Sequence, residues 1–186
     1  MKLLIVHNQV LLCDLLVQLC TRAFPHARVE KSLSDQQAVA LCTAFAPNIV
    51  LLSLGEASEA GRLTAIARAA PRAKIIVLSP RPRDYLLHCC LQARVHGFVD
   101  ISHEMSTAIP DAITAVRDTG RYFAPSFGLR KASLRKDPLA FSKVLTDREQ
   151  ELLCLLGEGL SNEEVAARIG VMASTVKVGG EPLSIR

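Results

Sequence analysis

The sequence predicts a doubly wound α/β domain, a (βα)5 parallel sheet covered by helices, followed by a small all-α helix-turn-helix domain. Four short apolar runs, together with a weaker strand pattern at residues 28–33, alternate with helical patterns over about the first 120 residues. These runs are apolar throughout rather than alternately polar, which is typical of parallel strands buried on both faces. Beyond residue 143 the remaining patterns are helical.

The chain can be divided in order, because turn-forming residues separate the patterns. Residues 3–6 are a continuous apolar run, and in residues 11–22 leucines recur at steps of three and four, so they share one helical face. Ser34 suits the N-cap of the next helix, and prolines or glycines end most helices. The expected strands are residues 3–6, 28–33, 49–52, 75–78 and 98–99, and the expected helices are residues 11–22, 36–45, 60–70, 84–95 and 106–119.

The composition describes a folded chain of one domain with a small appendage, or of two small domains. Of 186 residues, 49% are hydrophobic and 22% are charged, which is enough apolar material for a core. The net charge of +4 does not by itself indicate a nucleic-acid or membrane partner. The N-terminus lacks a signal peptide, and no apolar run reaches the roughly 18 residues of a membrane span. We therefore expect a cytoplasmic protein without a membrane partner.

The reactive residue types do not form a pattern of enzymes or metalloproteins. The six cysteines include no C-x-x-C pair and no Cys/His set at zinc spacing, which favours buried thiols in a reducing compartment. No nucleophile, base and orienting residue can be assembled from the predicted strand ends. We expect no metal site, no cofactor and no catalytic residue.

Polar residues at the predicted strand ends are the candidates for a functional site, because ligands of such folds gather at the carboxyl edge of the sheet. The positions are His7, Asn8, Ser53, Ser79 and Ile101.

The last part of the chain has a different organisation. Residues 130–143 contain five basic residues and one acid with little apolar periodicity, which indicates a linker. Helical patterns follow at residues 146–156 and 162–169, and a third begins at Ala173, which is a helix-turn-helix pattern. The expected boundaries are residues 1–125, 126–143 and 144–186.

These patterns resemble a known family. Residues 1 to about 125 look like the receiver domain of bacterial response regulators, and residues 144–178 resemble the LuxR-type helix-turn-helix of the NarL/FixJ group. The second resemblance rests on LTDREQELL at 145–153, GLSNEEVA at 159–166 and STVKV at 174–178. It implies a DNA-binding regulator of transcription.

The resemblance also marks a degenerate phosphorylation site. The family's acid pair, which binds Mg²⁺, aligns with His7 and Asn8, and its phosphoaccepting aspartate aligns with Ser53. The hydroxyl residue is retained as Ser79, whereas the family's lysine is replaced by Ile101. We therefore expect no aspartyl phosphorylation. Phe98 occupies the family's aromatic switch position, but packing of this strand-end ring in the core or at an interface is the favoured interpretation.

The resemblance places the DNA contacts on the last two helices of the pattern. Lys177 and Val178 align with groove-facing positions, Ser174 and Thr175 with the start of the recognition helix, and Asn162 with a phosphate-facing position. The pattern stops after Val178, where two glycines and a proline follow, so the recognition helix is expected to be incomplete. Residues 144–178 carry three basic and six acidic residues, a net charge of −3.

Two functions remain open at this point. One is an atypical response regulator that binds double-stranded DNA without aspartyl phosphorylation, as a homodimer through residues 84–95, 98–100 and 106–119. The other is a pseudo-receiver that has lost DNA binding and acts by pairing, with itself or with another regulator. Retardation of DNA with a steep salt dependence would distinguish the first from the second.

Overall fold

The computed structural model describes residues 1–55, 60–80, 83–104, 106–136, 140, 145–157 and 159–176. The chain forms two compact units, Met1–Lys136 and Asp137–Arg186. The division falls inside the segment 126–143 that the sequence predicts as a linker. Within the described residues, no helix is both long and apolar enough to cross a membrane.

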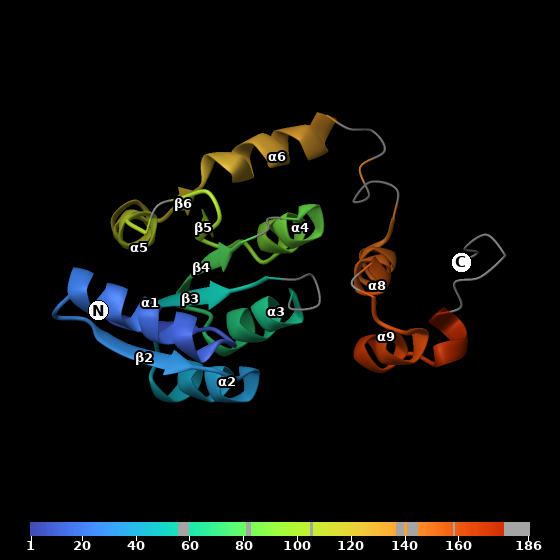
Figure 1. Ribbon diagram of the computed structural model, residues 1–186, viewed down its shortest axis with the longest axis horizontal. Coiled ribbons are helices and arrows are strands. Elements are labelled where there is room, and N and C mark those ends of the chain that lie inside the picture. The colour runs from blue at the N-terminus through green and yellow to red at the C-terminus, as the bar shows by residue number, and fades with distance from the viewer. Residues whose placement is uncertain are drawn as a thin grey trace. The chain divides into compact units, whose positions relative to one another are not determined.

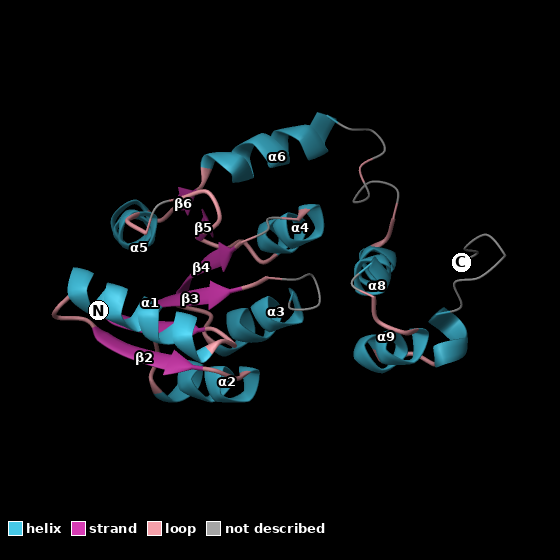
Figure 2. Cartoon of the chain, in the orientation of Figure 1, coloured by secondary structure: helices cyan, strands magenta, loops and turns pink. Residues whose placement is uncertain are grey.

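The first unit is a six-stranded sheet in the order β2-β1-β3-β4-β5-β6, and every neighbouring pair is parallel. The predicted doubly wound α/β fold is confirmed (Figures 1 and 2). The strands are β1 (Lys2–Val6), β2 (Arg28–Ser32), β3 (Ile49–Ser53), β4 (Lys74–Ser79), β5 (Gly97–Asp100) and β6 (Tyr122–Phe123). The helices are α1 (Val10–Ala23), α2 (Asp35–Ala44), α3 (Ala60–Ala69), α4 (Asp84–Gln92), α5 (Ala108–Thr119) and α6 (Pro125–Lys136).

Helices cover both faces of this sheet, because its central strands are apolar on both sides. All five residues of β3 are buried, and successive side chains enter opposite layers. Leu51 packs in the layer of α1 and α5, whereas Leu52 packs in the layer of α2, α3 and α4. The carboxyl ends of β1, β3, β4 and β5 consequently meet at one edge of the sheet.

Local signals set the helix ends. The hydroxyl oxygen of Ser34 accepts a hydrogen bond from the backbone N–H of Gln37 at 3.3 Å, so Ser34 caps α2 as predicted. Gly120 ends α5 at φ = 86°, a left-handed conformation that suits glycine.

The unit continues beyond the predicted last helix, through β6 and α6. Strand β6 has two residues, which is too short for a periodic pattern, and it pairs with β5. Helix α6 begins at Pro125, a residue type favoured in the first helical position. The ring of Phe127 lies 5.2 Å from that of Phe98 and 4.7 Å from that of Phe123, which fixes α6 against the sheet. Most of the segment predicted as a linker is therefore helical, at least to residue 136.

Among its described residues, the second unit contains α8 (Asp147–Gly157), α9 (Asn162–Ile169) and the four-residue 3-10 helix η2 (Ala173–Val176). Its small core joins Leu155 of α8, Val165 of α9 and Val176 of η2. A capping box begins α9, since Ser161 and Glu164 each accept a hydrogen bond from the other's backbone N–H. The predicted helix-turn-helix pattern thus corresponds to two helices and a short third turn.

Candidate functional site

Three of the predicted site residues meet at one cavity on the carboxyl edge of the first unit's sheet. His7 follows β1, Ser53 ends β3 and Ile101 follows β5, and all three line a cavity of about 480 Å³ between α1 and α5. His7 and Ser53 are buried, whereas Ile101 is 37% exposed. Asn8 is exposed and Ser79 is fully buried, and neither is among the described residues of the cavity wall.

The hydrogen bonds around His7 fix its ring. Its backbone N–H donates to the carbonyl of Ser32 at 3.1 Å, and its Nδ1 accepts from the backbone N–H of Gln9 at 3.0 Å. In the neutral ring, an accepting Nδ1 assigns the proton to Nε2. Nδ1, which faces the backbone, is therefore occupied as an acceptor.

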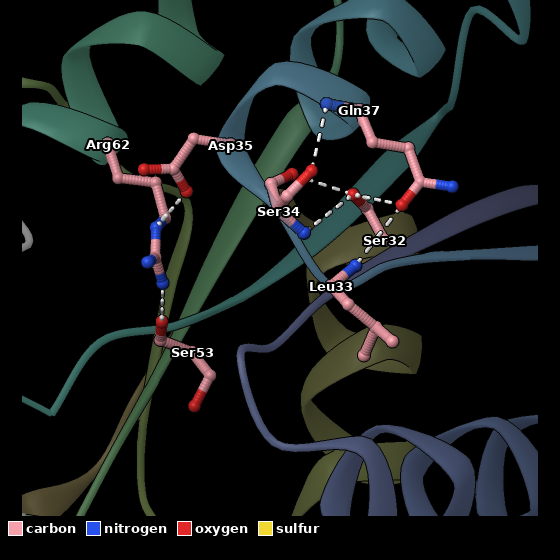
Figure 3. A network of polar contacts seen from close by, with 7 residues as sticks. All are labelled: Ser32, Leu33, Ser34, Asp35, Gln37, Ser53 and Arg62. Atoms are coloured by element: carbon pink, nitrogen blue, oxygen red, sulfur yellow. Dashed lines mark hydrogen bonds and ion pairs between the residues drawn. The ribbon is translucent and has the colours of Figure 1, made fainter.

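A basic side chain that the sequence reasoning missed holds the end of β3. The guanidinium of Arg62, in α3, donates to the carbonyl of Ser53 at 3.4 Å and pairs with the carboxylate of Asp35, as Figure 3 shows. Beside it, the hydroxyl of Ser32 donates to the carbonyl of Ser34 at 2.8 Å (Figure 3). The charge of Arg62 is thus shared with an acid of α2. Charge alone could not single out this residue among 22 Lys and Arg.

Asp100 is the second residue that the sequence reasoning missed. It ends β5, is 1% exposed, and accepts hydrogen bonds from the backbone N–H of Ser102 and the hydroxyl of Ser126, both at 3.2 Å. Nδ1 of His103 lies 3.1 Å from both carboxylate oxygens. A buried carboxylate requires such partners, and here they bind β5 to α6. The sequence signal was an acid at the end of an otherwise apolar run.

The residues at this edge do not fit Mg²⁺. The ion prefers hard oxygen ligands, usually including carboxylates, whereas the strand ends present His7 and the hydroxyl of Ser53, and the carboxylate oxygens of Glu104 in the cavity wall already accept hydrogen bonds from Asp100 and Tyr122. The carboxylate of Asp100 is engaged by Ser102, His103 and Ser126. Among the described residues, no group of three or more His, Cys, Asp or Glu is placed to hold a metal ion.

Phe98 is fully buried in the layer of α2, α3 and α4, where its ring packs against that of Phe127 at an angle of 44°. It lies on the opposite side of the sheet from Val99, which lines the cavity. This position agrees with the packing interpretation of Phe98 and gives the ring a contact with α6.

The predicted DNA-contacting residues lie in the second unit. Asn162 is the first residue of α9 and is exposed, and Ser174 and Thr175 lie in η2, where Ser174 is exposed. Lys177 and Val178 lie outside the described residues. The described part of the predicted third helix, Ala173–Val176, is a 3-10 turn that packs against its neighbours through Val176.

The comparisons with known proteins agree with this architecture. The family described as "Bacterial regulatory proteins, luxR family" matches residues 143–179. The chain has homology to the LuxR-type response regulators and shares their architecture, a receiver-like (βα)5 unit followed by a helix-turn-helix segment. The family resemblance of the sequence is thereby confirmed.

Particular relatives make the likeness concrete. The chain is 27% identical over 154 residues to the response regulator protein VraR of Staphylococcus aureus strain NCTC 8325, covering 80% of this chain and 72% of VraR. It resembles RcsB of Salmonella enterica serovar Typhimurium bound to promoter rprA, with a TM-score of 0.71, 18% identity, and coverage of 95% and 86% of the two chains. It also resembles a LuxR-family response regulator from Aurantimonas sp. SI85-9A1, with a TM-score of 0.62, 18% identity, and coverage of 73% and 98%.

Proposed function

We propose that this chain is a DNA-binding regulator of transcription that works without aspartyl phosphorylation. The observation that carries the proposal is the carboxyl edge of the sheet, where His7, Asn8, Ser53 and Ile101 occupy the positions at which the family resemblance calls for two acids, an aspartate and a lysine. Aspartyl phosphate needs a carboxylate acceptor and a divalent ion that neutralises the transferred group. Ser53 supplies no carboxylate, and the described residues around it fit no Mg²⁺ site.

Support for DNA binding comes from the second unit and from its relatives. The capped helix α9 and the turn η2 pack through a shared core, as a helix-turn-helix requires. Solved structures of RcsB, with which the chain shares its fold, include complexes with DNA. We infer that Asn162, Ser174 and Thr175, with Lys177 and Val178 outside the described residues, form the DNA-contacting surface.

Residues 144–178 and the segment 130–143 before them carry net charges of opposite sign. The net charge of −3 over residues 144–178 repels phosphates, so attraction has to come from the basic residues of 130–143. Within α6, Arg130 pairs with Asp84 of α4, whereas Lys131 and Lys136 border a surface pocket of the first unit. The acidic second unit is also the observation that favours the alternative, a pseudo-receiver that acts only by pairing.

We propose a homodimer formed through the first unit, on the face of α4, β5 and α5. Helix α6 packs against α4 and, through Ser126 and Phe127, contacts β5. A partner, whether a second copy or another regulator, would therefore meet the part of this face that α6 leaves open. Cross-linking through a cysteine introduced at exposed Asp111 of α5 would test this contact.

The phosphorylation half of the proposal is tested with acetyl phosphate and Mg²⁺ on the full chain. Intact-mass spectrometry at neutral pH is expected to find no phosphoryl adduct under conditions that label a conventional response regulator run in parallel. The informative variant restores the charges with His7→Asp, Asn8→Asp, Ser53→Asp and Ile101→Lys. A base-labile adduct on the unaltered chain would refute the proposal.

The DNA half is tested by gel retardation of promoter fragments at two salt concentrations. Each phosphate contact contributes a slope of about −0.9 in log K against log salt, so binding is expected to weaken steeply. Asn162→Asp adds a charge at the start of α9 and is expected to weaken binding. Glu163→Asp, its exposed neighbour, keeps its charge and serves as the control. Absence of retardation at low salt, with pairing retained, would support the adaptor instead.

A further inference from the structure

We propose that the cavity at the carboxyl edge of the sheet is a binding site for a small, uncharged amphipathic molecule. The proposal concerns how the regulator is controlled and rests, in its regulatory part, on the proposed function. The cavity has a volume of about 480 Å³, within the range of small-molecule sites. Its described lining residues are His7, Leu12, Leu15, Leu16, Leu19, Ser53, Leu78, Val99, Ile101, Glu104, Ser106 and Ile109.

The walls suit a hydrocarbon body. Four of the lining residues are leucines of α1, and Ile109 of α5 also lines the cavity. Leu12 is 38% exposed and Leu15 is 50% exposed, so α1 presents apolar surface that the chain itself leaves open. A ligand that covered these side chains would remove apolar area from water, which is the main favourable term in such binding.

The sheet end of the cavity supplies the polar contacts. The buried residues His7 and Ser53 come from strand ends, and the exposed Ser106 precedes α5. They offer hydroxyl and imidazole groups to a ligand's hydroxyl or amide. Glu104 also lines the cavity, and its carboxylate oxygens accept from the backbone N–H of Asp100 and the hydroxyl of Tyr122, both at 3.1 Å.

The charges select against an anionic ligand. Glu104 brings a carboxylate to the wall, and none of the described lining residues is Lys or Arg. A ligand carboxylate or phosphate would enter without a cationic partner and would be repelled by Glu104. An anionic head group is therefore excluded, and because both carboxylate oxygens of Glu104 already accept hydrogen bonds, we propose an uncharged one, as in an aliphatic or aromatic alcohol.

The depth of the cavity favours a small molecule over a second copy of the chain. Its inner wall includes the buried residues Leu78, Val99 and Ile109, and its rim carries the partly exposed Leu12 and Leu15. A helix of another chain would cover the rim and the neighbouring Leu11, which is 72% exposed, but would not reach the inner wall. Only a slender ligand would contact both.

One wall residue connects the cavity to the helix that leads out of the first unit. Glu104 binds the N–H of Asp100, whose carboxylate holds Ser126 of α6, and it also binds Tyr122 of β6. A ligand that shifts Glu104 would act on both attachments. We infer that occupancy of the cavity changes how α6 is held, and through α6 the DNA affinity of the full chain.

The test uses fluorescence of the uncharged probe N-phenyl-1-naphthylamine on the full chain, with octanol and octanoate as competitors. We expect saturable binding that octanol displaces at concentrations at least about tenfold lower than octanoate. Leu12→Trp fills the cavity from its rim, and we expect it to weaken probe binding at least about tenfold. Leu11→Trp is the matched control, because Leu11 is the adjacent exposed residue of the same helix and is not among the described lining residues.

Each outcome decides the proposal. Equal loss in both tryptophan variants, equal displacement by octanoate, or probe binding that appears only in a dimer by sedimentation velocity would overturn it. Leu15→Trp is a second filling variant should Leu12→Trp unfold, and thermal unfolding by circular dichroism shows whether each variant is folded. Octanol binding with unchanged DNA retardation would overturn the regulatory part alone, whereas absence of any retardation would refute the proposed function and leave the ligand site standing.

Discussion

Removing the Asp100 carboxylate is expected to loosen α6 from the sheet. The side chain is 1% exposed and accepts from the N–H of Ser102 and the hydroxyl of Ser126, with His103 at 3.1 Å. Asp100→Ala leaves these donors without this partner. An unsatisfied buried donor costs about 1–3 kcal/mol, and because Ser102 is exposed the cost for that group is at the low end. We expect a total loss of about 2 kcal/mol in the free energy of unfolding.

The assay is urea unfolding of the full chain, in which the transition of the first unit should shift to lower urea with an unchanged slope. Asp84→Asn is the matched control, since Asp84 also ties α6 to the domain, through Arg130 at 3.0 Å, but both side chains are about half exposed. Such surface pairs contribute about 0–1 kcal/mol. Equal losses in the two variants, or a loss below about 0.5 kcal/mol for Asp100→Ala, would refute the view that the buried carboxylate holds α6 more strongly than the exposed ion pair does.

Three further outcomes are expected. A Cβ at Gly97 would lie 3.1 Å from Cγ1 of Ile76, so Gly97→Ala should destabilise the first unit by about 1–3 kcal/mol in urea unfolding; an unchanged midpoint would contradict this. Burial lowers the pKa of His96 from its ordinary value of 6.5. Since the unfolded chain then binds the proton more readily, stability should be full above pH 6.5 and fall as the pH drops through the folded-state pKa, and His96→Gln should flatten this profile. Ser161→Ala removes the hydroxyl that accepts from the N–H of Glu164 and should cost the second unit about 1 kcal/mol, read from its thermal unfolding; Ser161→Asp, which keeps a cap, should restore it.

The sequence was sufficient for those elements whose signals are local. Continuous apolar runs located the central strands, and Ser34 marked the start of α2. It was insufficient for β6, which has two residues, and for α6, whose attachment depends on one ring, Phe127, and on contacts with distant parts of the chain. Periodicity indicates which residues share one face of a helix or strand, but it does not indicate which distant residues contact each other in the fold.

The candidate site was predictable in position but not in character. Parallel strands bring His7 and Ser53 to one edge, and the cavity is found there. The leucines of α1 were recognised as one helical face, yet the spacing does not reveal that Leu12 and Leu15 are only partly covered. Asp100 and Arg62 were missed because a charged residue becomes informative only when its burial and partners are known.

The uncharged residues at the sheet edge and the apolar cavity beside them have a common physical basis. A carboxylate in place of Ser53, which is 8% exposed, would have to be desolvated beside Leu78 and Val99, and without a metal ion or a lysine it would be poorly compensated. A hydroxyl at this position is compatible with apolar neighbours. Ile101 contributes an apolar side chain to the cavity wall, where a lysine would place a positive charge. We propose that the same uncharged residues both prevent phosphoryl transfer and allow an uncharged ligand to bind at this edge. The variant that carries the four charged residues should therefore lose probe binding, whether or not it gains phosphorylation.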